Sequence, residues 1–399
     1  MTFLREDLAQ LAAYQSPHPA NSETEGIAPI VLDGLDTNES PIDLPGDIKA
    51  QLADTYRSQI LANRYPNGDH QVLKQAIVAY AARSGNVQPE TIGLENITLG
   101  NGSDELIRSV LMATCLGNRG SILVNEPTFS MYAILANTLG VPVRRVQRQA
   151  NFEVDIASAQ AAIDSALNSD ANSAGEMLPV RVVFMVHHNS PTGNALAQRE
   201  IDWLKALPTD ILVVVDEAYF EFSDRTTLSE ALSRPNWLVL RTFSKAFRLA
   251  AHRVGYGIGH PAIISALEKL RLPYNLPSFS QAAALAALAH SDRLLTQIPT
   301  LLSERDRLLK ALAEHPYLQV WPSDSNFIYV RLSDRGRTAL GVTQQADGLA
   351  KVLDQLRASG TLIRHTGGGL RISIGTAEEN QRTLKNLQQA LNSKASAAS

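Results

Sequence analysis

Residues 211–219 read ILVVVDEAY, and residues 237–245 read WLVLRTFSK. Each stretch begins with a short run of apolar side chains and ends in polar and charged ones. Apolar runs of this length, without alternation, are typical of strands that are buried on both faces of a parallel sheet. The two stretches therefore predict two central strands, with Asp216 and Lys245 at or just after their carboxyl ends.

The same pattern extends outward from these strands. Further apolar runs occupy residues 121–125 and 180–186, and the segments around them show helical periodicity over 104–115, 128–139, 155–167 and 198–207. Strands that alternate with helices predict a doubly wound, mostly parallel α/β domain, in which ligands bind at the carboxyl ends of the strands.

From about residue 277 the pattern changes. Long amphipathic helices are expected over 280–289, 292–314 and 377–391, with short strands at 327–331 and 370–374. This part predicts a second, smaller α+β domain. We expect an N-terminal arm at 1–40, a large α/β domain at 41–280, the small domain at 281–392 and a disordered tail at 393–399.

Composition narrows the functional classes. The 399 residues carry 40 acidic and 36 basic side chains, a net charge of −4, so no basic field favours nucleic acid or anionic lipid. No apolar run approaches the roughly 20 residues that span a bilayer, and the first residues do not resemble a signal peptide. The single cysteine, Cys115, excludes an intrachain disulfide and a multi-cysteine zinc site, and we expect no metal. We therefore expect a cytoplasmic protein that binds neither nucleic acid nor membrane.

Lys245 and Asp216 are the first candidates for chemistry. A lysine at the end of a buried strand is partly desolvated, which lowers its pKa and makes the amine a nucleophile. A buried carboxylate such as that of Asp216 is costly unless it meets a cation, and a protonated pyridine nitrogen is such a cation. Tyr219 could hydrogen-bond a phenolic oxygen of the same ring. Taken singly, a surface lysine and an aspartate that caps a helix would also explain these positions.

Two further motifs suit a phosphate. Arg253 could bind it bidentately, and residues 100–105, GNGSDE, open a helix whose free backbone N–H groups form an anion cradle. Residues 189–193, NSPTG, form a turn that could present polar groups at the sheet edge. An amine-reactive aldehyde, a pyridine nitrogen, a phenolic oxygen and a phosphate together describe one ligand, pyridoxal phosphate.

With these motifs in this order, the chain resembles the fold-type I aminotransferases, and among them the histidinol-phosphate aminotransferases. The resemblance covers nearly the whole chain and rests on DEAY, TFSKAF with Arg253, GNGSDE, PTFSMY and SPTG. It implies that Lys245 forms the internal aldimine with pyridoxal 5'-phosphate, that Asp216 pairs with the pyridinium nitrogen and that Tyr219 contacts the phenolic oxygen. It also implies a set of residues around the cofactor phosphate, namely Gly102, Ser103, Asp104, Thr242, Ser244 and Arg253. Phe129 would pack against the face of the ring.

The resemblance bears on assembly and substrate as well. Tyr65 resembles a tyrosine that reaches the cofactor phosphate of the neighbouring subunit, which implies a homodimer with shared active sites. The family usually has asparagine before Pro-Thr-Gly, where this chain has Ser190, so either Asn189 or Ser190 supplies that contact. The implied substrate-binding residues, which include two arginines suited to a phosphate, are Tyr14, Asn38, Arg364 and Arg371.

The function implied by the resemblance is transamination between glutamate and imidazole acetol phosphate, which yields 2-oxoglutarate and histidinol phosphate in histidine biosynthesis. The substrates would be small amino and keto acids. An aromatic amino acid aminotransferase, or a pyridoxal-phosphate-dependent decarboxylase of the same fold, would keep every cofactor residue. A non-catalytic ligand-binding protein on the same scaffold is the alternative from another class, and a solvated turn arginine is the alternative reading of Arg364.

Overall fold

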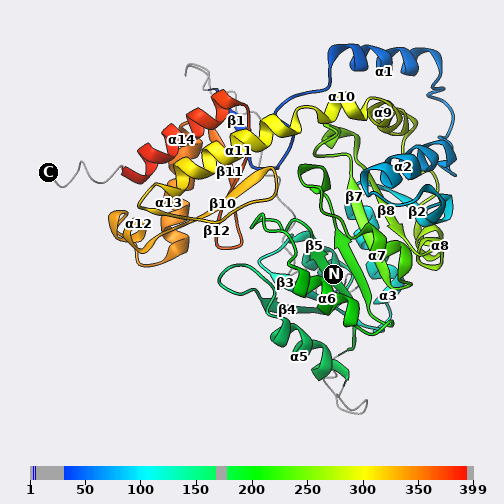
Figure 1. Ribbon diagram of the computed structural model, residues 1–399, viewed down its shortest axis with the longest axis horizontal. Coiled ribbons are helices and arrows are strands. Elements are labelled where there is room, and N and C mark those ends of the chain that lie inside the picture. The colour runs from blue at the N-terminus through cyan, green and yellow to red at the C-terminus, as the bar shows by residue number, and fades with distance from the viewer. Residues whose placement is uncertain (1–2, 4, 6–30, 168–177, 393–399) are drawn as a thin grey trace. The chain divides into compact units, whose positions relative to one another are not determined.

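The computed structural model describes residues 3, 5, 31–167 and 178–392, and Tyr14 and the expected tail at 393–399 lie outside them (Figure 1). The chain divides into two compact units. Unit 1 comprises Met1–Pro41, Pro191–Asn194 and Gln297–Ser399, and unit 2 comprises Ile42–Ser190 and Ala195–Thr296. The domain boundaries expected at 41, 281 and 393 stay predictions.

Unit 2 is built on a sheet whose strand order is β2-β8-β7-β6-β5-β3-β4. The strands β4, β3, β5, β6 and β7 run parallel to one another, whereas β8 is antiparallel to both β7 and β2. The bounds of the strands are β2 (Ile97–Asn101), β3 (Ser121–Glu126), β4 (Val143–Gln147), β5 (Val180–Val186), β6 (Leu212–Asp216), β7 (Trp237–Thr242) and β8 (Val254–Gly259).

Helices cover both faces of this sheet, which explains why the central strands are apolar without alternation. Along β6, Val213 and Val215 belong to one buried cluster and Val214 to another. The first cluster includes residues of α5 (Ile156–Leu167), α6 (Gln198–Ala206) and α7 (Leu228–Ser233). The second includes residues of α3 (Ser103–Thr114), α4 (Met131–Thr138) and α8 (Pro261–Leu270). The prediction of a doubly wound, mostly parallel α/β fold is therefore confirmed.

A third buried cluster lies beside β2 and β8 in the same unit. It includes residues from further helices, which are α1 (Gly46–Ser58), α2 (Gln71–Ser84), α9 (Ser278–Ala289) and α10 (Ser291–Leu295). The sequence predicted a single helix over 292–314, but the structure breaks it between Leu295 and Ile298. The reason is local, because Pro299 lies in the first turn of the following helix, where its missing N–H is tolerated.

Unit 1 contains a sheet of order β1-β11-β12-β10-β9. Its strands are β1 (Asp33–Leu35), β9 (Leu318–Val320), β10 (Phe327–Leu332), β11 (Thr361–Thr366) and β12 (Gly369–Ser373), and its helices are α11 (Ile298–Ala313), α12 (Asp334–Ala339), α13 (Gln345–Ala358) and α14 (Ala377–Asn392). Three residues of the expected N-terminal arm form β1, which pairs in parallel with β11.

The hairpin between β11 and β12 has a defined register. Thr366 pairs with Gly369, and the two residues between them, Gly367 and Gly368, have φ values of 59° and 75°. Two consecutive positive φ angles are the signature of the type I′ turn, which glycine adopts without steric cost. The turn sets the pairing further along the hairpin, where Arg364 lies directly opposite Arg371.

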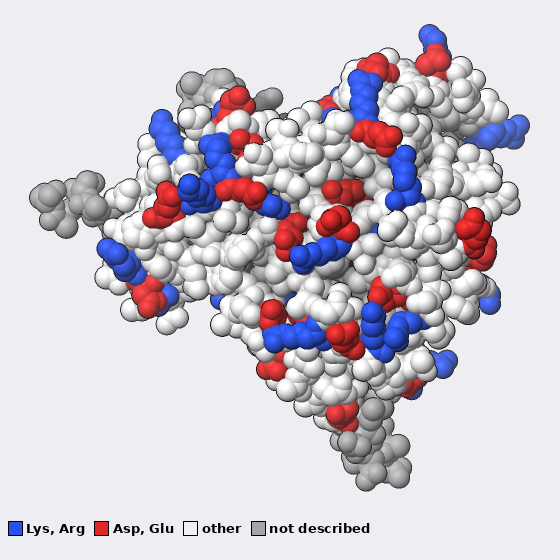
Figure 2. All heavy atoms as spheres, viewed as in Figure 1, with Lys and Arg blue, Asp and Glu red and all other residues white. Residues whose placement is uncertain are grey.

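In the part of the chain that the structure describes, no helix is both long enough and apolar enough to cross a membrane. On the face shown in Figure 2, acidic and basic side chains of the described residues are interspersed, and many lie next to a side chain of opposite sign. Ion pairs among the described residues include Arg293 with Asp47 and Arg307 with Glu304.

Candidate functional site

The site begins where β6 and β7 end side by side. Asp216 is the last residue of β6, its Cα pairs with that of Leu240 on β7, and the next residue donates its N–H to the Leu240 carbonyl at 2.8 Å. Thr242 ends β7, and Lys245 follows three residues later in a partly buried position. Because the two strands are parallel neighbours, Asp216 and the Thr242–Lys245 segment emerge at the same edge of the sheet.

Asp216 is a buried carboxylate, with 2% of its surface exposed. In the described part of the chain its hydrogen-bond donors are neutral groups, namely Tyr132 Oη at 2.8 Å and the N–H of Ala218 at 3.1 Å. Burial raises the pKa of this carboxyl to about 6, although the two hydrogen bonds oppose the rise. A carboxylate in this state would be stabilised by a cation placed against it.

Tyr132 is a site residue that our sequence reasoning missed. It lies in the first turn of α4, has none of its surface exposed, and stacks on Phe184 of β5 with ring centroids 4.6 Å apart. The motif PTFSMY contained it, but a tyrosine at the start of an apolar helix resembles an ordinary core aromatic. Its hydrogen bond to Asp216 joins residues that are 84 positions apart in the chain, and no local sequence pattern predicts such a bond.

The predicted phosphate-binding residues come together between β2, β7 and β8. Arg253 donates from Nη2 to Asp104 Oδ2 at 3.1 Å and from Nη1 to Ser244 Oγ at 3.4 Å. Thr242 Oγ1 donates to Ser244 Oγ at 2.9 Å. Helix α3 begins at Ser103, and Gly102 before it provides no side-chain cap, so the first-turn N–H groups can face an anion. We call Gly102, Ser103, Asp104, Thr242, Ser244 and Arg253 the phosphate cradle.

Glycine is required in this cradle for reasons of space. Gly102 has a φ of +74°, and a Cβ there would lie 2.5 Å from Arg253 Nη2. At Gly255 on β8, a Cβ would lie 2.5 Å from the backbone N of Ser103. The backbone of the cradle is thus packed directly against β8, and the N–H of Gly102 donates to the carbonyl of Arg253 at 2.8 Å.

Phe129 and Asn189 lie beside Tyr132 and the end of β5. Phe129 meets Tyr132 edge to face, with ring centroids 5.5 Å apart. The Asn189 amide accepts from Thr128 Oγ1 at 3.1 Å and from Arg148 Nη2 at 3.2 Å, and it donates to the carbonyl of Pro127 at 3.0 Å. Asn189 therefore holds the segment that carries Phe129, and Ser190 next to it is buried.

Tyr65 lies on the surface of unit 2. Its side chain is 81% exposed and stacks on Tyr274, with ring centroids 4.6 Å apart and ring planes 12° apart. A tyrosine in this position is available to another molecule.

In unit 1, the structure brings together three of the four predicted substrate residues. Arg364 and Arg371 occupy directly paired positions on β11 and β12. Ser373, which follows Arg371 on the same face of the strand, donates from Oγ to Asn38 Oδ1 at 2.9 Å. Arg371 Nη2 donates to the carbonyl of Asp36 at 2.6 Å, so the segment after β1 is tied to the same arginine.

Two arginines opposite each other on one face of a sheet repel, because side chains at directly paired positions are only about 4.5–5.5 Å apart at Cβ. An anion between the two guanidinium groups would turn this repulsion into attraction. The pair is therefore a candidate anion-binding site, and the two-glycine turn that sets the register is part of it.

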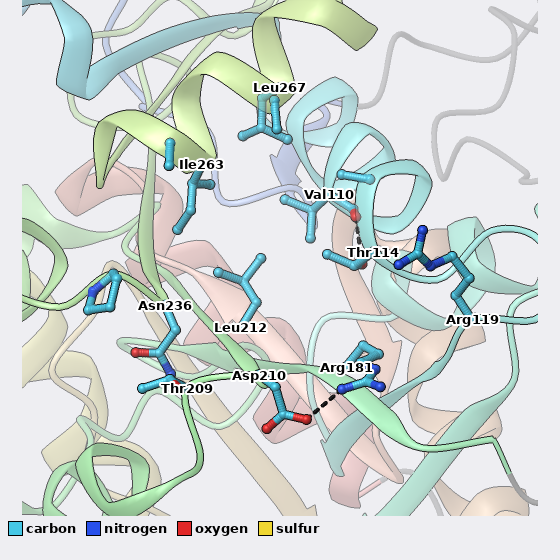
Figure 3. Close-up of a pocket in the computed structure, with 14 residues that line it drawn as sticks. Val110, Thr114, Arg119, Arg181, Thr209, Asp210, Leu212, Asn236, Ile263 and Leu267 are labelled. Atoms are coloured by element: carbon cyan, nitrogen blue, oxygen red, sulfur yellow. Dashed lines mark hydrogen bonds and ion pairs between the residues drawn. The ribbon is translucent and has the colours of Figure 1, made fainter.

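A separate cavity of about 650 Å³ lies in unit 2 at the other edge of the sheet (Figure 3). Leu212 and Arg181, near the amino-terminal ends of β6 and β5, line it together with Val110 of α3 and Ile263 of α8. Arg181 and Asp210, which form an ion pair, are among the residues that line it (Figure 3). The lining includes none of the predicted site residues, so this cavity is distinct from the site at the carboxyl ends of the strands.

Comparison with known proteins gives a consistent family. The family described as aminotransferase class I and II matches residues 32–387. A histidinol-phosphate aminotransferase of Trichodesmium erythraeum is 53% identical over 97% of this chain and 99% of the relative, and histidinol-phosphate aminotransferase 2 of a Nostoc species is 54% identical over 98% of each. The solved structure of a histidinol-phosphate aminotransferase from Sinorhizobium meliloti, in complex with pyridoxal-5'-phosphate, has a TM-score of 0.75 at 23% identity and covers 91% of this chain and 92% of that one.

The hydrogen bond from Tyr132 leads to a pH prediction. Tyr132→Phe removes a donor to the charged form of Asp216, so the pKa of that carboxyl should rise further above its ordinary value. A hydrogen bond to a charged group is worth roughly 1.5–3 kcal/mol, which corresponds to about 1–2 pH units. Titration of ¹³C-labelled aspartate by NMR in the ligand-free protein measures this directly.

The matched control for this prediction is Tyr80→Phe. Tyr80 is also a buried tyrosine that hydrogen-bonds a carboxylate, but its partner is Glu221 at 3.1 Å. The control should leave the Asp216 titration where it is in the wild type. An unchanged Asp216 pKa in Tyr132→Phe would show that the hydrogen bond does not set the charge of the site.

Proposed function

Because the chain belongs to the class I and II aminotransferases, we propose that it transfers the amino group of glutamate to imidazole acetol phosphate and forms histidinol phosphate, in histidine biosynthesis. Relatives about half identical over nearly the full chain are named histidinol-phosphate aminotransferases, which supports this choice of substrate. A cytoplasmic location is part of the same proposal.

The residues at the sheet edge fit pyridoxal phosphate as the cofactor. Asp216 is a buried carboxylate whose described hydrogen-bond donors are neutral, and a pyridinium nitrogen would supply the missing positive charge. The phosphate cradle has the backbone approach, the arginine and the hydroxyls that a phosphate requires, and a Cβ on Gly102 would obstruct it. When bound, the cofactor supplies an aldehyde that combines with amines and a ring that accepts electrons.

The side chains would then have distinct roles. The Nζ of Lys245 would hold the cofactor and, once released, take the proton from the α-carbon of the amino donor as a general base. Asp216 would keep a proton on the ring nitrogen, and the raised pKa of its carboxyl would return towards the ordinary range beside that positive charge. Tyr219, which is 6% exposed, would hydrogen-bond the phenolic oxygen, and Phe129 would pack against the ring face.

The observation that carries the choice of substrate is the opposed pair of Arg364 and Arg371. A phosphate dianion offers three oxygens and two charges to two guanidinium groups, whereas a single carboxylate satisfies one arginine bidentately. Asn38, held by Ser373 beside the pair, adds a polar group from the segment after β1. Tyr14 would complete this set. The same arginines would receive the α-carboxylate of glutamate in the other half-reaction, because the phosphate of histidinol phosphate takes the place of the α-carboxylate of an amino acid.

Three alternative functions would keep the cofactor residues but would not require the pair of Arg364 and Arg371 to bind a phosphate. An aromatic aminotransferase or a decarboxylase of the same fold would use the phosphate cradle and Lys245 unchanged. A non-catalytic ligand-binding protein would bind the cofactor without turnover. Keto acid formation from glutamate, carbon dioxide release and the absence of both distinguish the three.

We also propose that the protein acts as a homodimer with shared active sites. Several large apolar side chains are exposed in the two segments that the Tyr65–Tyr274 stack brings together, namely Leu61 (66%), Tyr65 (81%), Val72 (64%), Leu272 (69%) and Tyr274 (46%). The stack joins the segments 61–72 and 272–274 into one surface, which we call the Tyr65 surface. Apolar groups gathered in this way mark an interaction site, and a second copy with two-fold symmetry would cover both surfaces at once.

The arginine pair predicts an asymmetry between half-reactions. Arg364→Ala should lower kcat/KM for histidinol phosphate by about 10- to 150-fold, the equivalent of one charge-assisted hydrogen bond, and should affect glutamate less. Arg371→Ala should impair both half-reactions, because Arg371 also holds the segment after β1. Each half-reaction is measured separately by the absorbance change of the cofactor. Arg357→Ala, an exposed arginine on α13 of the same unit, is the control and should leave both rates unchanged.

Equal losses for both substrates in Arg364→Ala would remove the argument for a phosphate site. An aromatic aminotransferase would then be the better interpretation, and activity with phenylpyruvate in place of imidazole acetol phosphate would support it.

The assembly proposal is tested by sedimentation. The wild type should be a dimer, and Leu272→Asp should weaken it by roughly 100-fold or more, because an unpaired charge in an apolar interface costs several kcal/mol. Leu116→Asp, at an exposed leucine after α3, is the matched control and should remain dimeric. A wild type that is a stable and fully active monomer would contradict the proposal.

A further inference from the structure

The segment between α8 and α9 contains two adjacent residues with different partners. Tyr274 has a φ of 57° and stacks on exposed Tyr65, as part of the Tyr65 surface. Asn275, the next residue, is partly buried, and its side chain contacts the segment that leads into the phosphate cradle. One short connection thus contacts both the Tyr65 surface and the residues that flank the cradle segment.

Asn275 makes hydrogen bonds on both sides of Gly102. Its Nδ2 donates to the carbonyl of Leu99 at 3.2 Å and to Glu105 Oε2 at 2.9 Å, and its own carbonyl accepts from Asn101 Nδ2 at 3.4 Å. Glu105 Oε2 also accepts from the backbone N–H of Asn101. The end of β2 and the first turn of α3 are therefore held together through one side chain.

The bond to Glu105 matters electrostatically. Glu105 lies in the first turn of α3, two residues after Ser103, where the N–H groups are expected to meet a phosphate. A carboxylate that is free to move there would repel the phosphate and compete for the same donors. The bonds from Asn275 and Asn101 fix that carboxylate in one place.

Arg271 connects the same segment to the Tyr65 surface. Its Nη1 donates to Asn275 Oδ1 at 3.1 Å, and its Nη2 donates to the carbonyl of Gly68 at 2.9 Å. Gly68 lies three residues after Tyr65, and a Cβ there would touch the ring of Tyr274 at 3.3 Å. Hydrogen bonds thus run without a break from the segment that carries Tyr65 to the two ends of the cradle segment.

We propose that Asn275 is a positioning residue that fixes the phosphate cradle and connects it to the Tyr65 surface. The proposal rests on the proposed function in one respect, which is that the ligand of the cradle is pyridoxal phosphate. The proposal predicts that loss of Asn275 weakens the binding of the phosphate group and leaves the binding of the ring unchanged.

The test compares two ligands that differ only in the phosphate. The ligand-free protein is titrated with pyridoxal 5'-phosphate and with pyridoxal, and the affinity is followed by the absorbance of the ligand. In Asn275→Ala, the affinity for pyridoxal 5'-phosphate should fall roughly tenfold, the equivalent of one hydrogen bond, while that for pyridoxal stays within about twofold. Asn275→Asp should lose at least as much, because its carboxylate faces Glu105.

The matched control is Gln281→Ala. Gln281 makes two hydrogen bonds in the same region, to the carbonyls of Asn67 at 3.1 Å and Leu276 at 2.9 Å, but its hydrogen bonds do not reach residues 99–105. Both affinities should be unchanged in this variant. Circular dichroism of each variant establishes that it is folded.

Three outcomes would overturn the proposal. Equal losses for both ligands in Asn275→Ala would mean that the residue only stabilises the fold, and unchanged affinity for both would mean that the cradle does not depend on it. A wild type that binds the two ligands equally would remove the phosphate role of the cradle itself. Failure of the proposed function would be seen separately. In that case the rates with imidazole acetol phosphate would be low, while the affinities for pyridoxal 5'-phosphate and pyridoxal would still change as stated.

Discussion

A carboxylate buried at the end of a strand is unstable unless something positive meets it, and the site depends on this constraint at Asp216. The strand β6 is apolar on both faces because helices cover both, so its last residue cannot reach solvent. Tyr132 and the N–H of Ala218 orient the carboxylate but do not neutralise it. Burial therefore leaves the group with a raised pKa and a strong preference for a cation, which a pyridinium ring would satisfy.

The two units each contribute one arrangement that suits an anion, and they do it by different means. In unit 2, glycines let the backbone of the phosphate cradle pack against β8, and Arg253 adds the positive charge. In unit 1, a two-glycine turn sets a register that places Arg364 opposite Arg371. Under the proposed function, the first arrangement would bind its anion mainly through backbone N–H groups, and the second would bind through two side-chain charges. Such a division suits a cofactor that stays in place and substrates that exchange.

Much of this could be predicted from the sequence where the signal was local. The strands β5, β6 and β7 could be predicted because strands that are buried on both faces are apolar throughout. The motifs at Gly102, Lys245 and Arg253 could be recognised because the residues of each motif are close together in the sequence. The break between α10 and α11 at Pro299 was missed, although proline is itself a local signal. Strand β1 was missed because a three-residue strand carries no periodicity and is stabilised by pairing with β11, more than 320 positions later. Tyr132 and Asn275 were missed because their roles depend on hydrogen bonds between distant segments.

Replacement of Asp216 by asparagine tests the central claim most directly, with turnover and stability measured on the same variant. The pKa of Asp216 in the folded, ligand-free protein is raised to about 6. Ionisation of this carboxyl therefore does not change the free energy of unfolding below about pH 4, lowers it progressively as the pH rises from there, and lowers it by a constant amount well above pH 6. At pH 7, ligand-free Asp216→Asn should therefore be more stable than the wild type by roughly 2–3 kcal/mol, with the difference disappearing near pH 4. Turnover should nevertheless fall by several orders of magnitude, because the ring nitrogen loses its partner. An asparagine variant that keeps near-normal turnover, or that is less stable than the wild type at pH 7, would contradict the account.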